Sequence, residues 1–276
     1  TSHLEPLEYS IRHSDSNYIV AGDQEQADKV LELKSTCPKV KKVIVDDPKG
    51  MRHYDDPLLA FFKDIQMSGR RLAETQPQLF DELIADVSPD DVGMINYTSG
   101  TTGLPKRVGH TATSYPVGHL STTVMAGVKT DDIHHNLSAP GWAKWAWSSF
   151  FAPFNLGATA TGFNFSVLNA NKYVAAVARY RVSSFCAPPT AWRAFVGLDL
   201  ARYDFSAMKY SLSAGEPLNP EVIDQWKRAT GTEIRDFYGQ TESTSMIGNP
   251  PWMEGNMRFG SFGDHVGPTV VGDTRN

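Results

Sequence analysis

Residues 98–106 combine the side-chain types that bind a polyphosphate. Glycines let backbone N–H groups approach an anion closely, hydroxyls add donors, and Lys106 adds a positive charge. The usual P-loop pattern is not met, because Pro105 stands where that pattern has its second glycine. The alternative is a flexible linker, but a linker rarely follows a strand so tightly or ends in Pro-Lys. We therefore predict a phosphate-binding loop with the sequence Thr98-Ser99-Gly100-Thr101-Thr102-Gly103-Leu104-Pro105-Lys106, directly after a strand.

A second loop, Ser213-Ala214-Gly215-Glu216-Pro217-Leu218, offers contacts to a flat ring. Its Ala-Gly pair would let a ring approach the backbone, and Glu216 adds a polar contact. Any turn between a strand and a helix can use Gly and Pro, so this loop taken alone indicates structure rather than function.

A third loop, residues 236–242, has side chains for a base, a phosphate and a metal ion. Tyr238, next to Gly239, can stack on a purine, and Thr241 can donate to a phosphate oxygen. Glu242 can bind Mg²⁺, a hard cation that takes carboxylate and phosphate oxygens together. An exposed polar turn explains this loop equally well when it is judged alone. Its sequence is Asp236-Phe237-Tyr238-Gly239-Gln240-Thr241-Glu242.

Short β-rich runs alternate with helical patterns, which predicts an α/β fold of parallel-sheet subdomains with helices on both faces. The clearest helix is 219–230, with Asn219 as N-cap, Pro220 at the first position and Gly231 at the C-terminal end. Ligands of such sheets bind beyond the carboxyl ends of strands, so the three loops are expected at one edge. Candidate strands are 18–21 (buried), 43–45, 94–97, 135–139, 159–163, 184–187, 210–213 and 233–237; other candidate helices follow Asp23 and begin at Leu58.

Composition excludes several other classes of protein. The formal net charge of −5 argues against a nucleic-acid binder, which needs a basic excess to neutralise phosphates. No apolar run approaches the ~18 residues of a membrane span, and the polar N-terminus does not resemble a signal peptide. Cys37 and Cys186 are far apart and give neither zinc spacing nor a disulfide framework. These features favour a cytoplasmic protein.

The three loops together resemble motifs of the adenylate-forming superfamily, which includes acyl- and aryl-CoA synthetases, peptide adenylation domains and luciferase. Residues 97–106, 213–218 and 238–242 match its motifs in the right order, and the first and third are highly specific. Further stretches resemble the acetyl- and medium-chain acyl-CoA synthetase branch: Gly141-Trp142-Ala143-Lys144-Trp145, Cys186-Ala187-Pro188-Pro189-Thr190-Ala191-Trp192-Arg193 and Gly215-Glu216-Pro217-Leu218-Asn219-Pro220.

This resemblance implies an AMP-forming acyl-CoA synthetase that activates a fatty or related carboxylic acid with ATP and Mg²⁺ and then thioesterifies coenzyme A. Lys106, Thr241 and Glu242 would be catalytic, with Glu242 also binding the metal. Gly141 and Trp142 would line the acyl or thiol side, although a packed helix face explains Trp142, Trp145 and Trp147 as well. The ATP-binding set would be Thr98, Ser99, Gly100, Thr101, Thr102, Gly103, Lys106, Gly215, Glu216, Pro217, Asp236, Phe237, Tyr238, Gly239, Gln240 and Thr241.

The chain also departs from the family pattern. Arg107 stands where the motif has Gly, and an arginine there would cost about 1–2 kcal/mol if the site needs a positive φ. The family's small C-terminal domain with its catalytic lysine is expected to be absent, so we interpret the chain as a fragment of the large domain. We expect a first, partial α/β subdomain at 1–115. A second, at 116–276, would contain the nucleotide site and the start of a third, β-rich subdomain.

Two rival functions remain at this stage. One keeps the adenylation chemistry but has a different acceptor, as in carrier-protein-dependent or luciferase-like enzymes. The Gly-Trp-Ala-Lys-Trp and Ala-Pro-Pro-Thr stretches argue against it. The other is a nucleotide-binding fragment without turnover, which Arg107 and the missing lysine domain would favour.

Overall fold

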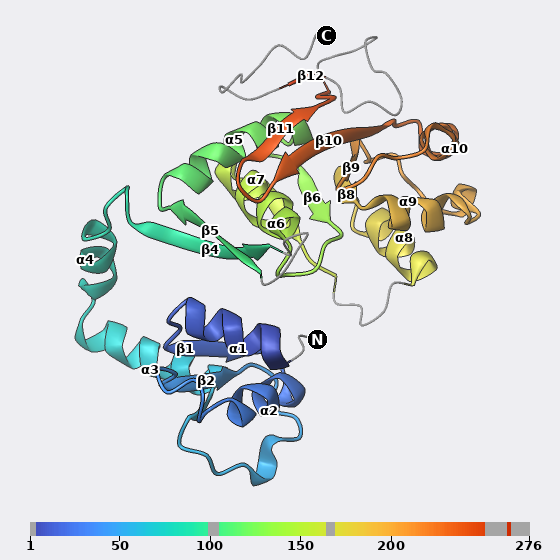
Figure 1. The fold of residues 1–276 in the computed structure, drawn as a ribbon. Coiled ribbons are helices and arrows are strands. Elements are labelled where there is room, and N and C mark those ends of the chain that lie inside the picture. Colours follow the sequence, from blue (N-terminus) through green and yellow to red (C-terminus); the bar gives the residue numbers. More distant parts are fainter. Residues whose placement is uncertain (1–3, 99–104, 164–168, 252–263, 266–276) are drawn as a thin grey trace. The chain divides into compact units, whose positions relative to one another are not determined.

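The computed structural model describes residues 4–98, 105–163, 169–251 and 264–265 (Figure 1). The chain divides into two compact units, residues 1–108 (unit 1) and 109–276 (unit 2), and each has its own parallel sheet. A subdomain boundary at residue 115 stays a prediction.

Unit 1 contains α1 (Leu4–His13), β1 (Tyr18–Ala21), α2 (Gln24–Glu32), β2 (Lys42–Val45), η1 (Met51–His53), β3 (Leu59–Phe61), α3 (Phe62–Thr75), α4 (Leu79–Ala85) and β4 (Val92–Thr98); β5 (Lys106–Thr111) begins in it.

The first sheet of unit 1 has the parallel order β1-β2-β3. Asp23 caps α2 as predicted, because its Oδ1 accepts the backbone N–H of Gln26 at 3.0 Å. Ala27 and Val30 of α2 are buried against Val43 and Val45 of β2. The predicted strands at 18–21 and 43–45 are therefore confirmed, together with the helix between them.

Two details of unit 1 differ from the prediction. Strand β1 buries only one face, since Tyr18 is 61% exposed and Val20 is 63% exposed. The helix expected from Leu58 begins only at Phe62, because residues 59–61 form β3 and pair in parallel with β2. A pairing with a strand far away in sequence overrides the local helical pattern here.

Unit 2 is built on a seven-stranded sheet of order β12-β11-β10-β9-β8-β6-β7, in which β7, β6, β8, β9 and β10 are parallel. The added strands β11 and β12 are antiparallel. The elements are α5 (Ser114–Ala126), β6 (Ile133–Asn136), α6 (Ala143–Trp145), η2 (Ala146–Phe151), α7 (Ala152–Asn155), β7 (Thr159–Thr161), α8 (Ala170–Arg179), β8 (Ser184–Ala187), α9 (Pro189–Val196), η3 (Leu200–Arg202), β9 (Tyr210–Ala214), α10 (Pro220–Thr230), β10 (Ile234–Gln240), β11 (Thr244–Gly248) and β12 (Asp264–His265).

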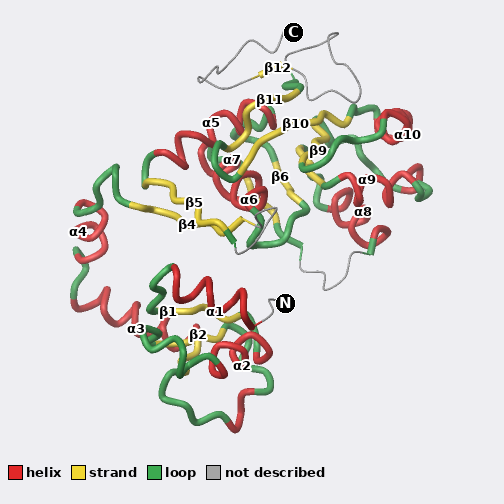
Figure 2. Tube along the Cα trace, in the orientation of Figure 1, coloured by secondary structure: helices red, strands yellow, loops and turns green. Residues whose placement is uncertain are grey.

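Helices cover both faces of this sheet, as two consecutive histidines of β6 demonstrate. The Nε2 of His134 lies 2.8 Å from the Ser148 hydroxyl of η2. The next side chain, His135, points to the opposite face and contacts the hydroxyl of Tyr173 in α8. Figure 2 shows the helices on the two sides of the strands. The predicted fold class, parallel sheet with helices on both faces, is confirmed.

The helix predicted at 219–230 is α10, with the expected caps. The Asn219 side chain accepts from the backbone N–H of Glu221 at 2.9 Å, Pro220 takes the first position, and Gly231 has a φ of 77°. The strand ends differ from the prediction by a few residues. Strand β6 ends at Asn136 rather than 139, so residues 137–139 form a loop, and β10 continues to Gln240.

Trp226 of α10 is the centre of the main core of unit 2. It is fully buried, its Nε1 donates to the Ser211 hydroxyl at 2.9 Å, and its ring packs edge-on against Trp192 with centroids 4.7 Å apart. This core joins α8, α9 and α10 to one face of the sheet. Within the described ranges, no helix combines the length and the apolar character needed to cross a bilayer.

We expect Trp226→Ala to lower the free energy of unfolding by about 3–5 kcal/mol, because it leaves a large cavity in this core. Trp226→Phe should cost less, since most of the packing stays and only the N–H bond is lost. Urea unfolding followed by circular dichroism measures both. As a control, Trp142→Ala should change stability by no more than about 0.5 kcal/mol, because that ring is 70% exposed. Equal losses for the two alanine variants would contradict this assignment of the core.

Candidate active site

Three stretches that the sequence singled out meet around one pocket of unit 2, with a volume of about 490 Å³. They follow the carboxyl ends of β6, β8 and β9, which is where open parallel sheets bind ligands. The pocket therefore joins the Gly-Trp-Ala-Lys-Trp, Ala-Pro-Pro-Thr and Ala-Gly-Glu stretches. The lining residues are Leu137, Ser138, Ala139, Trp142, Lys144, Pro188, Pro189, Thr190, Ala191, Ala214, Gly215 and Glu216.

Asp236 fixes the second predicted loop against the third. It faces Ser213 across the parallel pair β9–β10, and its Oδ2 accepts the backbone N–H of Leu218 at 3.2 Å. The side chain is only 4% exposed, and this burial raises the pKa of the carboxyl to about 6. A hydrogen bond to a buried carboxylate thus holds residues 213–218 beside the strand that leads to Tyr238.

The third loop is the tight turn of a hairpin between β10 and β11. Phe237 is buried, Tyr238 is partly exposed, and Glu242 is exposed at the turn. Of the two aromatic residues, only Tyr238 therefore offers part of its ring to a ligand. The pairing is irregular between Tyr238 and Gly239.

Two glycines in these loops are required by geometry. Gly215 has a φ of 111°, a conformation that other residues adopt only with strain. A Cβ on Gly239 would lie 2.1 Å from the carbonyl oxygen of Thr244 and 2.9 Å from the ring of Trp147. The turn can close only because Gly239 has no side chain.

Lys144 is a candidate functional residue that was not predicted from the sequence, although it lies within the Gly-Trp-Ala-Lys-Trp stretch. Its Nζ donates to the carbonyl of Ala214 at 3.2 Å and lines the pocket. Burial lowers its pKa. A single half-buried cation in an otherwise mainly apolar pocket is suited to hold an anionic group.

The three tryptophans after Gly141 have different environments. Trp142 is 70% exposed and lines the pocket, whereas Trp147 is buried. Trp145 is partly buried in the short helix α6. The packed-face interpretation thus fits Trp147 and Trp145, while Trp142 remains a candidate for ligand contact.

The predicted phosphate loop joins β4 to β5, which form a separate two-stranded sheet, so the expectation that all three loops follow strands of one parallel sheet is wrong for this loop. Ser99, Gly100, Thr101, Thr102 and Gly103 lie outside the described residues, while Thr98 ends β4 and Lys106 begins β5 with an exposed side chain. Lys106 belongs to unit 1, and Tyr238 and Glu242 belong to unit 2. Their convergence on one nucleotide therefore stays a prediction.

Arg107 does not introduce the backbone strain that was considered from the sequence. It lies in strand β5 and is not among the described residues with a positive φ. Its guanidinium donates to the carbonyl oxygen of His13 at 3.2 Å. Arginine at this position is thus compatible with the strand, and its guanidinium makes a hydrogen bond to the last residue of α1.

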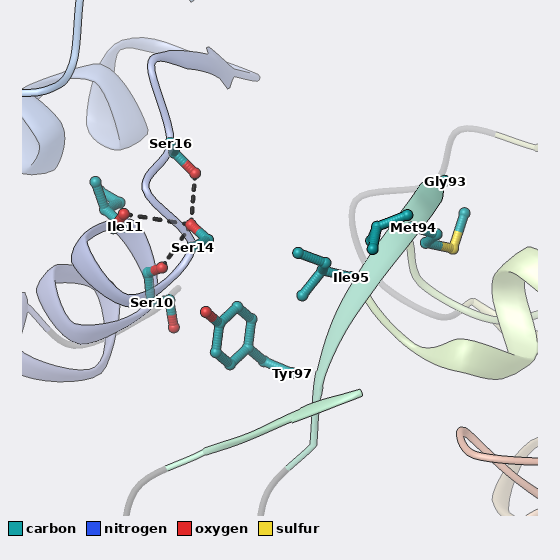
Figure 3. A pocket seen from close by; sticks show the side chains of 9 residues that line it. Ser10, Ile11, Ser14, Ser16, Gly93, Met94, Ile95 and Tyr97 are labelled. Atoms are coloured by element: carbon teal, nitrogen blue, oxygen red, sulfur yellow. Dashed lines mark hydrogen bonds between the residues drawn. The ribbon is translucent and has the colours of Figure 1, made fainter. Parts of the chain in front are cut away.

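A second hollow, of about 480 Å³, lies within unit 1 between α1 and β4 (Figure 3). The Ser14 hydroxyl donates to the carbonyl of Ser10 at 2.7 Å and lies 2.6 Å from the Ser16 hydroxyl. No charged side chain lines this hollow. Since its hydroxyls bond one another and the main chain, it carries no comparable chemistry.

Over the part of the chain that the structure describes, no three His, Cys, Asp or Glu side chains gather as a metal cage. Glu242 is instead a single exposed carboxylate. This arrangement suits Mg²⁺, which is commonly held by one or two carboxylates together with substrate phosphates and water.

Together the parallel sheet and the pocket at the carboxyl ends of its strands define an α/β protein with the ligand-site position typical of open parallel sheets, and its family follows from comparison with known proteins. The family model described as AMP-binding enzyme matches residues 1–272. The chain belongs to this family.

Curated relatives include 4-hydroxybutyrate–CoA ligase 1 of Metallosphaera sedula, 51% identical over 203 residues, which are 71% of this chain and 35% of that protein. The mitochondrial acyl-coenzyme A synthetase ACSM4 of Homo sapiens is 30% identical over 264 residues, covering 95% of this chain and 43% of that one. The chain thus spans between about a third and a half of these relatives' length.

Solved structures show the same fold. The anthranilate CoA ligase AuaEII, determined with anthranoyl-AMP, has a TM-score of 0.78 and 23% sequence identity; the match covers 96% of this chain and 48% of that one. MatB of Rhodopseudomonas palustris, determined with bound ATP, has a TM-score of 0.71 and 17% identity, covering 97% and 48%. At these identities the likeness concerns the fold.

We expect Asp236→Asn to remove a pH dependence of stability. The folded-state pKa of about 6 lies above the ordinary 3.8, so folding favours the protonated form and the contribution of this carboxyl to stability falls as the pH rises from about 4 to 6. One pKa unit corresponds to ~1.4 kcal/mol, so this loss reaches about 3 kcal/mol at most. Asparagine keeps an acceptor for Leu218 without the charge, so the unfolding free energy of the variant relative to wild type should rise over this range. Burial lowers the pKa values of His119, His134 and His135, which act in the opposite direction but equally in both proteins. Urea titrations at several pH values measure both proteins; parallel pH profiles would contradict the assignment.

Proposed function

We propose that this chain carries the nucleotide and acid sites of an AMP-forming acyl-CoA synthetase acting on a fatty or related carboxylic acid. The observation that carries the proposal is the pocket at the carboxyl ends of β6, β8 and β9, held to the third loop by Asp236. The names of the relatives support this choice, since two of them are a 4-hydroxybutyrate–CoA ligase and an acyl-coenzyme A synthetase.

In the first half-reaction, the substrate carboxylate attacks the α-phosphorus of ATP and pyrophosphate leaves. The loop 98–106 would bind the phosphates through backbone N–H groups, hydroxyls and the Lys106 ammonium. The partly exposed ring of Tyr238 would stack on the adenine, and residues 215–217 would border the adenosine. Thr241 would donate to the α-phosphate. The protein's contribution is positioning and charge stabilisation rather than covalent catalysis.

In the second half-reaction, the thiolate of coenzyme A attacks the acyl carbonyl and AMP leaves. The pocket contains the groups for the acid and thiol side. Trp142 offers an exposed aromatic surface at its wall, and Lys144 would already have provided the cation for the entering carboxylate in the first half-reaction. Gly141, with a φ of 101°, lets the chain turn before that tryptophan.

Mg²⁺ would be held by Glu242 and the nucleotide phosphates, where it neutralises phosphate charge. We place the enzyme in the cytoplasm, because Cys37 and Cys186 are both free and buried, as suits a reducing compartment. The formal net charge of −5 supports small-molecule substrates rather than nucleic acid.

Two assays separate this proposal from its rivals. Pyrophosphate–ATP exchange that depends on a carboxylic acid distinguishes an adenylating enzyme from a nucleotide-binding protein without turnover. AMP release that depends on coenzyme A distinguishes the synthetase from an adenylating domain with another acceptor. Absence of exchange with short, medium and aryl acids in the full-length protein would overturn the proposal.

In the full-length protein we expect Lys106→Ala to lower the rate of acid-dependent exchange at least about tenfold, since a lysine–phosphate contact at the site is worth more than ~1.4 kcal/mol. Lys172→Ala is the matched control, because that lysine is exposed on α8, outside the candidate site. An unchanged rate in Lys106→Ala would remove this lysine from the mechanism.

Glu242→Gln should raise the Mg²⁺ concentration needed for half-maximal exchange, because an amide is a weaker ligand for a hard cation than a carboxylate. Asp224→Asn, which removes an exposed carboxylate from α10, should titrate like wild type. The measurement is exchange rate against free Mg²⁺ at fixed ATP. Superimposable curves for Glu242→Gln and wild type would exclude a metal role for Glu242.

A further inference from the structure

Three buried aromatic side chains form a continuous chain of contacts that ends on the backbone of the turn 238–242. They are His110 of β5, Tyr115 of α5 and Trp147 of η2, which are 8%, 1% and 4% exposed. We call these three residues the aromatic relay. None of them belongs to the loops that resemble the family motifs, and none was singled out as a ligand contact.

The relay contacts the turn at two places. The Nε2 of His110 lies 2.7 Å from the carbonyl oxygen of Thr241. A carbonyl oxygen only accepts, so Nε2 carries the hydrogen and donates it. At the other end, the ring of Trp147 lies against Gly239, where an added Cβ would be 2.9 Å from its Cη2. The backbone is thus held on both sides of Gln240.

Tyr115 joins these two ends. Its ring stacks on His110 with centroids 4.1 Å apart and an interplanar angle of 24°. Its hydroxyl accepts the Nε1–H of Trp147 at 2.8 Å. Each member of the relay is therefore fixed by the next, and the orientation of the His110 ring is set by packing as well as by its hydrogen bond.

Helix α5 fixes the strand that follows the turn as well. The Thr244 hydroxyl donates to the carbonyl of Gly118 at 2.8 Å, and the Ser121 hydroxyl donates to the carbonyl of Ser245 at 2.7 Å. Thr244 itself has a φ of 61°, which a threonine adopts only when its surroundings determine the backbone. The turn is thus placed by a set of specific bonds rather than by a general apolar contact.

From these contacts we infer that His110 is a positioning residue, which sets the Thr241 and Glu242 side chains for phosphate and metal through its bond to the Thr241 carbonyl. This inference rests on the proposed function. The position of His110 supports this inference, because His110 lies in strand β5, which begins at Lys106. The same strand therefore carries the phosphate lysine and the donor that fixes the turn of Glu242.

The test compares His110→Phe, which keeps a ring on Tyr115 but loses the donor, with His110→Gln, which keeps an N–H donor on a side chain of similar reach. His135→Phe is the matched control, since His135 is also buried but lies in β6, where its ring contacts Phe163, Tyr173 and Phe185. The first readout is hydrogen–deuterium exchange of peptides covering 238–245, without nucleotide. We expect about five- to tenfold faster exchange in His110→Phe, the order that loss of one hydrogen bond gives, and near wild-type exchange in His110→Gln and His135→Phe.

The second readout is acid-dependent pyrophosphate–ATP exchange in the full-length protein. His110→Phe should lower kcat and raise the Mg²⁺ requirement with little change in KM for the acid, and His110→Gln should restore most of kcat. If wild type shows no exchange with any acid, the proposed function fails, while the deuterium measurement still decides whether His110 holds the turn. Wild-type deuterium exchange in His110→Phe, or equally faster exchange in His135→Phe, would overturn the inference.

Discussion

Hydrogen bonding between β8, β9 and β10 in parallel register fixes where the loops beyond their carboxyl ends lie. The second loop leaves β9, the third continues from β10, and the Ala-Pro-Pro-Thr stretch leaves β8. Neighbouring parallel strands are about 4.8 Å apart, so these segments meet although up to about fifty residues separate them in sequence. The antiparallel β11 then folds back on β10, which turns the third loop into a tight hairpin rather than a crossover. The site is thus a consequence of strand direction.

Asp236 shows that bringing these loops together lowers stability. Its carboxyl is buried at the centre of the sheet edge, where ionisation is unfavourable, and among the described residues its Oδ1 has no hydrogen-bond partner. The carboxylate nevertheless connects two loops through Leu218, and this type of trade-off between stability and geometry is common where a structure must hold a ligand.

Local signals in the sequence predicted much of this structure. Asn219, Pro220 and Gly231 defined α10 because caps depend on neighbouring residues only, and the three loops were found because their side chains are chemically distinctive. The failures involve long-range contacts. Leu58 and the residues after it follow a helical pattern, yet three of them pair with β2; Lys144 becomes a pocket residue only because Ala214 lies beside it. Nothing in the spacing of His110, Tyr115 and Trp147 predicts that they form one chain of contacts.

The predicted phosphate loop continues in sequence into a strand and then into a helix that contacts β11. Strand β5 begins at Lys106, contains His110 and leads into α5, and α5 bonds to Thr244 and Ser245 of β11. Residues 106–126 are thus one continuous segment that begins in unit 1 at Lys106 and, within unit 2, contacts the strand that follows Glu242. A flexible linker at 98–106 would need no such buried continuation. The buried continuation of the loop favours its prediction as a functional loop over a flexible linker, while its meeting with Glu242 on one nucleotide stays part of the proposal, because Lys106 belongs to unit 1 and Glu242 to unit 2.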